Sequence, residues 1–196
     1  MINKWSVGIF LFNEVEVLDF AGPFEVFSVT EAYEEKPFTV YTVSQNGEMI
    51  TARNGLKVQP DYSIEDLPPV DILIIPGGKG VRESEVKNDI IIKWVRQQMK
   101  EVKLMTSVCT GALLLAKAGL LENLKATTHW ASIQTFEKDF PNVEVMENVK
   151  FVDEGHIITS AGISAGINMS FHIVTNLLGV EVAAETAKSM EYDIDL

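Results

Sequence analysis

The chain reads KLMTSVCTGALLLAKAG from Lys103 to Gly119, and this stretch decides the fold. Its first half is apolar and β-prone, and its second half is rich in strong helix formers, so a strand turns into a helix at Cys109. A side chain at such a corner lies at the carboxyl end of the sheet, beside the N-terminus of the next helix. The partial positive charge of that helix end favours a thiolate, so the sequence predicts a reactive thiol.

The segments on both sides of this corner continue the alternation of strand and helix. Dense apolar runs predict strands, and apolar residues spaced three and four apart predict helices. We expect strands at 5–12, 38–44, 71–75 and directly before Cys109, hairpins near 45–55 and at 149–159, and helices at 23–35, 89–100, 110–118, 131–139, 164–178 and 181–190. Such alternation is typical of an α/β fold with a doubly wound, mostly parallel sheet flanked by helices.

Composition favours one domain that spans residues 1–196. A hydrophobic content of 46% is enough for a single core, and no linker or repeat divides the chain. The N-terminus lacks a signal-peptide pattern, and no apolar stretch reaches the roughly 20 residues of a membrane span, so we expect a cytoplasmic protein. The formal net charge of −12 disfavours nucleic acid and membrane surfaces as partners.

The chain contains a single cysteine, which leaves Cys109 free for chemistry. An intrachain disulfide is excluded, and a thiolate-rich metal site is implausible. The three histidines lack the spacing of a helical metal site, so we expect neither a metal nor another cofactor. A lone cysteine is more often a buried structural residue, but its place at a strand-to-helix corner reverses that expectation.

Two other segments are expected to meet Cys109, because ligands of open α/β sheets bind beyond the carboxyl ends of the strands. Asp19 follows the first strand and is the candidate proton donor, with helix capping as its alternative role. Gly77 and Gly78 follow the third long strand and are candidate oxyanion donors through their amides, together with the amide of Thr110. The alternative for the glycine pair is an ordinary tight turn, since the spacing of a phosphate loop is absent.

Of the three histidines, only His129 is a candidate residue of the site. His129 precedes an aromatic residue, Trp130, and is retained as a substrate-pocket candidate. His156 is interpreted as a solvated turn residue. His172 is interpreted as a helix residue that is packed or held by a partner side chain.

These motifs together resemble the DJ-1/ThiJ/PfpI superfamily, which has a flavodoxin-like, class I glutamine amidotransferase-like fold. The resemblance covers nearly the whole chain, and is closest to isonitrile hydratases and to the amidase-like domains of AraC-type regulators. Asn168 departs from it, because relatives commonly have Asp there. The matching segments are LDFAGPFEVF at 18–27, DILIIPGG at 71–78, SVCTGA at 107–112, AGLL at 118–121, ATTHW at 126–130 and TSAGISAGI at 159–167.

The resemblance implies roles for the residues of the site. Cys109 matches the nucleophile of the elbow, Asp19 its acidic partner, and Thr110 the threonine that follows the cysteine in isonitrile hydratases. PfpI-type peptidases have His at that last position, so a peptidase is disfavoured. The implied reaction is a cofactor-independent attack of the Cys109 thiolate on a small electrophile. That electrophile is an isonitrile, which becomes an N-substituted formamide with Asp19 as the proton donor.

Two alternatives remain open at this point. A glyoxalase-like attack on an aldehyde, or attack on an activated amide, would use the same groups. A non-catalytic sensor would report oxidants through an exposed thiol of low pKa, or would bind a metabolite, as the AraC-type resemblance suggests. The chain ends at Leu196, so we expect no attached DNA-binding segment. The resemblance also implies a homodimer.

Overall fold

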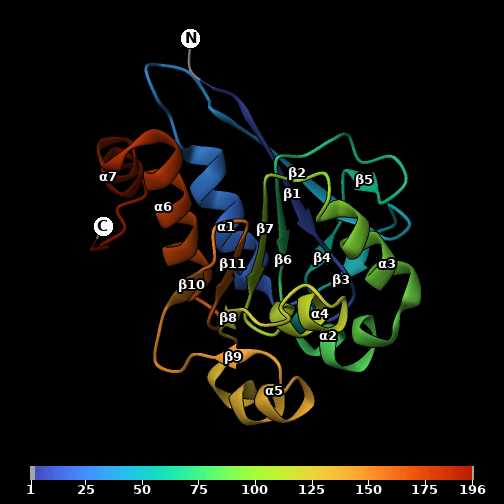
Figure 1. The fold of residues 1–196 in the computed structure, drawn as a ribbon. Helices are drawn as coiled ribbons and strands as arrows, with labels where there is room; N and C mark the ends of the chain where they lie inside the picture. Colours follow the sequence, from blue (N-terminus) through green and yellow to red (C-terminus); the bar gives the residue numbers. More distant parts are fainter. Residues whose placement is uncertain (1–2, 196) are drawn as a thin grey trace.

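A seven-stranded sheet forms the centre of the protein, with helices on both of its faces (Figure 1). The structure is a computed structural model that describes residues 3–195. In spatial order the strands are β10 (Phe151–Asp153), β11 (Ile157–Ser160), β7 (Leu104–Val108), β6 (Ile72–Ile75), β1 (Trp5–Phe10), β2 (Phe38–Ser44) and β5 (Tyr62–Ser63). Every neighbouring pair is parallel except β10 with β11. The predicted α/β fold with a mostly parallel sheet is confirmed.

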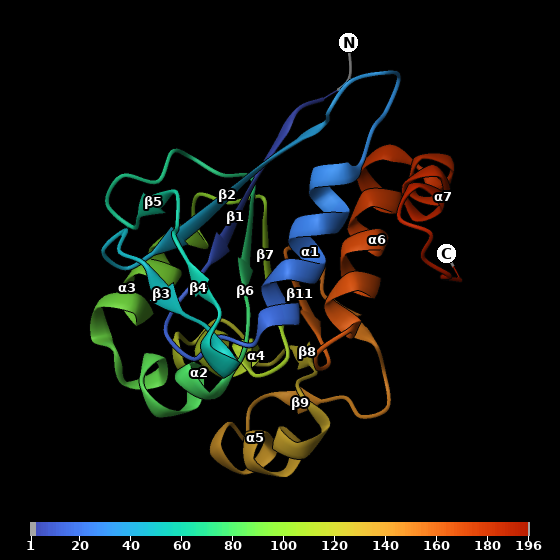
Figure 2. The same cartoon turned by 180° about the vertical axis from the view of Figure 1, so that it is seen from behind.

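The helices form a layer on each side of this sheet. Helix α1 packs against α6, and α6 against α7, along one face, as the view from behind shows (Figure 2). Helix α4 packs against β6 and β7 on the other face, together with α2 and α3. The bounds are α1 (Val17–Val29), α2 (Lys79–Glu83), α3 (Asp89–Gln98), α4 (Gly111–Lys117), α5 (Ile133–Asp139), α6 (Ala165–Leu178) and α7 (Val180–Ser189).

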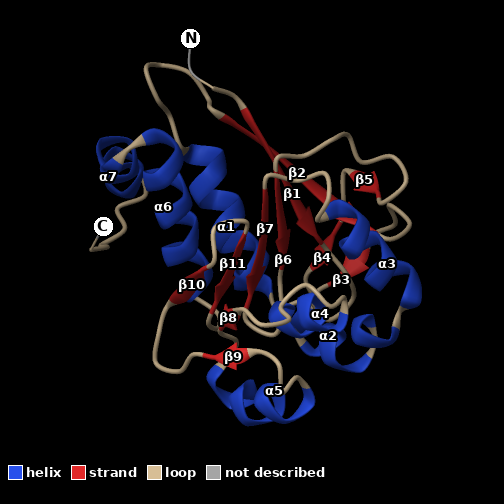
Figure 3. Ribbon diagram, in the orientation of Figure 1, coloured by secondary structure: helices blue, strands red, loops and turns tan. Residues whose placement is uncertain are grey.

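Short elements complete the chain. Strands β8 (Lys125–Ala126) and β9 (Glu144–Val145) pair beyond one end of the large sheet, beside α5 (Figure 3). Strands β3 (Ile50–Thr51) and β4 (Lys57–Val58) form one of the hairpins expected near residues 45–55. Single helical turns are η1 (Arg53–Gly55), η2 (Glu85–Lys87) and η3 (Trp130–Ser132). Within residues 3–195, no helix combines the length and the apolarity needed to cross a membrane.

The central strands are buried on both faces. All four residues of β6 are fully buried, because helices cover both sides of the sheet at this central strand. Their register brings three loops to one level, since Ile75 pairs with Ser107 and Val108 pairs with Ser160. The segments that follow β6, β7 and β11 therefore leave the sheet side by side.

Helix α1 begins six residues earlier than the prediction of a helix at 23–35. It runs from Val17 to Val29, so Pro23 lies inside the helix rather than in its first turn. Proline is favoured in a first turn but has no amide to donate to the carbonyl four residues before it, which here belongs to Asp19. Burial of the apolar residues of α1 against α6 outweighs that loss. Asp19 consequently lies in the first helical turn.

Candidate active site

Cys109 occupies the corner between β7 and α4, as predicted. Its φ angle is 57°, in the left-handed region that residues other than glycine rarely adopt. Its amide donates to the carbonyls of Ser160 (3.1 Å) and Ala161 (3.2 Å), and its carbonyl accepts a hydrogen bond of 2.8 Å from the Thr128 hydroxyl. These contacts hold a strained backbone in place, which is typical of a nucleophile elbow.

The thiol of Cys109 is buried, so the expectation of an exposed thiol of low pKa is wrong. The residue is only 5% exposed. Burial raises the pKa of the Cys109 thiol and the nearby Asp19 carboxylate raises it further, whereas the amide and the side chain of Thr110 oppose the change. The seven-residue helix α4 does not overcome this burial. The resting group is therefore a thiol, which needs a base before it can act as a nucleophile.

Asp19 is fully buried beside this thiol, and its Oδ2 accepts a hydrogen bond of 3.0 Å from the amide of Gly77. Among the described residues, its Oδ1 has no hydrogen-bond partner. Burial raises the pKa of Asp19 to about 7, although the Gly77 amide and the Cys109 thiol lower it. The carboxyl reaches across to Gly77 and does not cap α1. Asp19 consequently gains and loses its proton near neutral pH.

The glycine pair meets Thr110 and Asp19, as predicted from the strand ends. A Cβ on Gly77 would lie 2.5 Å from the Thr110 amide nitrogen and 3.0 Å from Oδ2 of Asp19, so only glycine fits. The amide of Gly78 donates to the Thr110 hydroxyl at 2.9 Å. Both glycine amides thus have partners inside the protein, and that of Gly77 positions the acid. Their role as oxyanion donors stays a prediction that requires these amides to change partners.

His129 lies at the same site, beside a residue that the sequence interpretation did not single out. A Cβ on Gly162 would lie 3.3 Å from Sγ of Cys109 and would also overlap the ring of His129. Gly162 therefore leaves space between the thiol and the imidazole. The sequence did hold a signal for Gly162. This glycine comes just after the apolar run that forms β11, and β11 pairs with β7. Burial and the charge of Arg82 lower the pKa of His129, so the ring is neutral at neutral pH.

The other two histidines lie as interpreted. His156 is exposed in the turn between β10 and β11. His172 is held by Asp153, with 2.7 Å between Nε2 and Oδ2. Among residues 3–195, no group of three His, Cys, Asp or Glu side chains is arranged to hold a metal ion.

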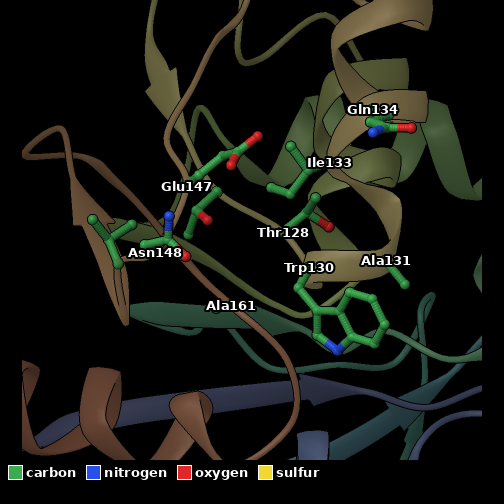
Figure 4. A pocket seen from close by; sticks show the side chains of 10 residues that line it. Thr128, Trp130, Ala131, Ile133, Gln134, Glu147, Asn148 and Ala161 are labelled. Carbon is green, nitrogen blue, oxygen red and sulfur yellow. The ribbon is translucent and has the colours of Figure 1, made fainter.

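A cavity of about 540 Å³ lies beside the elbow (Figure 4). Thr128 and Ala161 in its wall are two of the residues that hydrogen-bond the backbone of Cys109, whereas Cys109 itself is not part of the lining. Trp130 stands at the cavity with 81% of its surface exposed. Other lining residues include Ile133, Glu147 and Asn148. The cavity has room for a small organic group beside the elbow.

Comparison with known proteins places the chain in a family. The family model described as "DJ-1/PfpI family" matches residues 5–176. The chain belongs to the DJ-1/PfpI family. This DJ-1/PfpI chain is 32% identical to isonitrile hydratase from Pseudomonas putida over 187 residues, which cover 95% of the chain and 78% of the hydratase.

The chain is also similar to a transcriptional regulator and to a protein of known crystal structure. The HTH-type transcriptional regulator GbdR from Pseudomonas aeruginosa is 26% identical over 192 residues, which cover 97% of the DJ-1/PfpI chain but only 52% of GbdR. The chain therefore spans about half the length of that regulator. The crystal structure of a ThiJ/PfpI family protein from Pseudomonas syringae superposes with a TM-score of 0.88 at 25% identity, and covers 100% of this chain and 78% of the other.

Proposed function

We propose that this DJ-1/PfpI protein is a cysteine-dependent hydratase of a small electrophile, with isonitriles as the substrate class. The observation that carries the proposal is the buried pair of Cys109 and Asp19, in which a thiol of raised pKa faces a carboxyl with a pKa of about 7. The identity of 32% with isonitrile hydratase supports the choice of substrate. No cofactor is required by this chemistry.

The reaction begins with a proton transfer between the pair. Asp19 in its carboxylate form takes the S–H proton of Cys109, and the thiolate forms a bond to the terminal carbon of the isonitrile. Asp19 then delivers the same proton to that carbon, which gives a thioimidate. Sulfur and hydrogen have both added to the carbon, so neither an oxidant nor a reductant is needed.

Water completes the turnover. It adds to the thioimidate carbon, and its protons pass to the nitrogen and to sulfur as the C–S bond breaks. The products are an N-substituted formamide and the original thiol, so the net reaction adds one water molecule to the isonitrile. The amides of Gly77, Gly78 and Thr110 are the donors proposed for charge that develops in these steps, and His129 is proposed to line the substrate pocket.

The test is a substrate panel measured beside two matched variants. Cys109→Ala should abolish formation of formamide from small alkyl and aryl isonitriles, followed by mass spectrometry. Ser170→Ala, which removes one heavy atom from another fully buried site, should leave turnover unchanged. Turnover that survives in Cys109→Ala would overturn the role of the thiol. A wild type without activity on isonitriles would exclude the substrate class, and activity on α-oxoaldehydes would favour a glyoxalase-like enzyme.

A metabolite or redox sensor is the second candidate. It is favoured by the similarity to GbdR, which extends over 97% of this chain. The burial of Cys109 argues against direct reaction with oxidants and favours binding of a metabolite. Intact-mass analysis after mild peroxide treatment separates the two modes: gain of two oxygen atoms on Cys109 supports redox sensing, and an unmodified thiol counts against it.

A further inference from the structure

A second cavity, of about 560 Å³, shares Ala131 with the lining of the first cavity but no other lining residue. Its walls come from α2, η2, α4, η3 and α5, and its lining contains neither Cys109 nor Asp19. A volume of this size suits a small organic molecule. Nothing in the proposed hydration uses this cavity.

Three positive charges surround this second cavity. Arg82, Lys87 and Lys117 lie on three different elements and converge on it. Within residues 3–195, none of the three forms an ion pair with an acidic side chain. The single acidic residue in the lining is Asp139.

Basic residues outnumber acidic ones in the lining of this cavity, whereas the whole chain has 28 acidic and 16 basic residues. Basic side chains in so acidic a protein have many carboxylates available to them. Cations that gather unpaired around one cavity therefore create a local positive potential on an otherwise negative molecule, and this potential attracts anions.

The floor of the second cavity is apolar. Leu113 is buried there, and Val86 and Phe140 are half-buried. A hydrated inorganic anion would satisfy the cations but would leave this apolar surface in water. A ligand that carries one anionic group on an apolar body fits both features, because its body covers the floor while its charge faces the basic rim.

We propose that this cavity binds a small carboxylate with an apolar body, at a site whose lining contains neither Cys109 nor Asp19. The carboxylate accepts hydrogen bonds from Arg82, Lys87 and Lys117, and the apolar body packs on Leu113, Val86 and Phe140. The proposal does not depend on the reaction at Cys109, and it holds equally for an enzyme and for a sensor.

The test uses a fluorescent probe of the same chemistry, 1-anilinonaphthalene-8-sulfonate, which carries one anionic group on an aromatic body. We expect saturable binding to the folded wild type, and displacement of the probe by octanoate but not by octanamide, its neutral counterpart. The double variant Lys87→Gln/Lys117→Gln should weaken probe binding about tenfold, since two charged contacts are lost.

Matched controls make the result decisive. The double variant Lys93→Gln/Lys100→Gln removes the same charge from exposed lysines outside the cavity and should leave binding unchanged. Cys109→Ala should also bind the probe as the wild type does, so a failure of the hydratase proposal is separable from a failure here. Three results would each overturn the site. Both lysine double variants could weaken probe binding equally, or octanoate and octanamide could displace the probe equally. The third is that the folded wild type does not bind the probe.

Discussion

At the residue scale, the proposed function depends on one buried pair of titratable groups. Burial raises the pKa of both groups, and the Asp19 carboxylate raises that of Cys109 further, whereas the hydrogen bond with the Cys109 thiol lowers the pKa of Asp19. At neutral pH Cys109 is therefore a thiol, beside a carboxyl that is close to its own pKa of about 7. A catalyst that must first move a proton from sulfur to a carboxylate is consistent with this state.

The pH dependence of turnover follows from the raised pKa of Asp19, which is about 7. Below that pH the carboxyl is protonated and cannot accept the thiol proton, so the rate should fall about tenfold per pH unit. Above it the rate should reach a plateau. The measurement is kcat/KM for an isonitrile from about pH 5 to about pH 9. A profile without a transition near neutral pH would contradict Asp19 as the base.

The same pKa predicts a stability change in Asp19→Asn. The folded pKa of about 7 lies above the usual value of 3.8, so ionisation of the buried carboxyl costs folding free energy. The cost grows as the pH rises from about 4 to about 7 and is constant above. Asn keeps an oxygen to accept from the Gly77 amide, so the variant should gain about 2 to 4 kcal/mol over wild type near pH 8. Urea denaturation near pH 4 and pH 8 tests this: an equal effect at both would contradict it.

At the element scale, the elbow depends on how closely α4 approaches β6. Gly111 begins α4, and a Cβ there would overlap the carbonyl oxygen of Ile75, which is rigid backbone. Gly8 in β1 lies equally deep in the fold, but a Cβ there would meet a flexible methyl of Leu73 at 3.3 Å. The position of the thiol is thus set by a contact between a helix and a strand that tolerates only glycine.

These two glycines make a matched prediction. Gly111→Ala should destabilise the protein by about 3 kcal/mol or more and lower turnover, because α4 and the elbow must move apart from β6. Gly8→Ala should cost less than about 1 kcal/mol, since the side chain of Leu73 can shift. The free energies of unfolding in urea decide the comparison. Equal costs would mean that close approach of α4 is not required.

At the scale of the whole molecule, the expectation of a homodimer is still a prediction. Leu18 and Phe24 on α1 are 39% and 38% exposed, and contact with a second copy would remove this apolar surface from water. Light scattering after size exclusion should give twice the chain mass of 21.8 kDa. Phe24→Glu should yield the monomer, because it places a charge in the contact. A monomeric wild type at about 10 μM would exclude a dimer of ordinary affinity.

Much of the fold follows from local patterns that need no knowledge of distant residues. A dense apolar run reads as a buried strand wherever it lies, and the change from strand to helix at Cys109 is visible within seventeen neighbouring residues. Parallel strands then bring Asp19, Gly77 and Cys109 to one edge, because their carboxyl ends share it. The start of α1 was predicted wrongly since burial against α6 outweighed the local preference of Pro23.

The sequence by itself thus determined the sheet, the elbow and the three segments that meet there, because these depend on local propensity and on the rules of strand connection. Only the tertiary structure decided the chemistry of the pair. The amide that holds Asp19 comes from Gly77, 58 positions away, and the hydroxyl that meets Gly78 comes from Thr110, 32 positions away. Burial and pKa arise from such distant contacts and from the packing around them, and no local pattern in the chain records either.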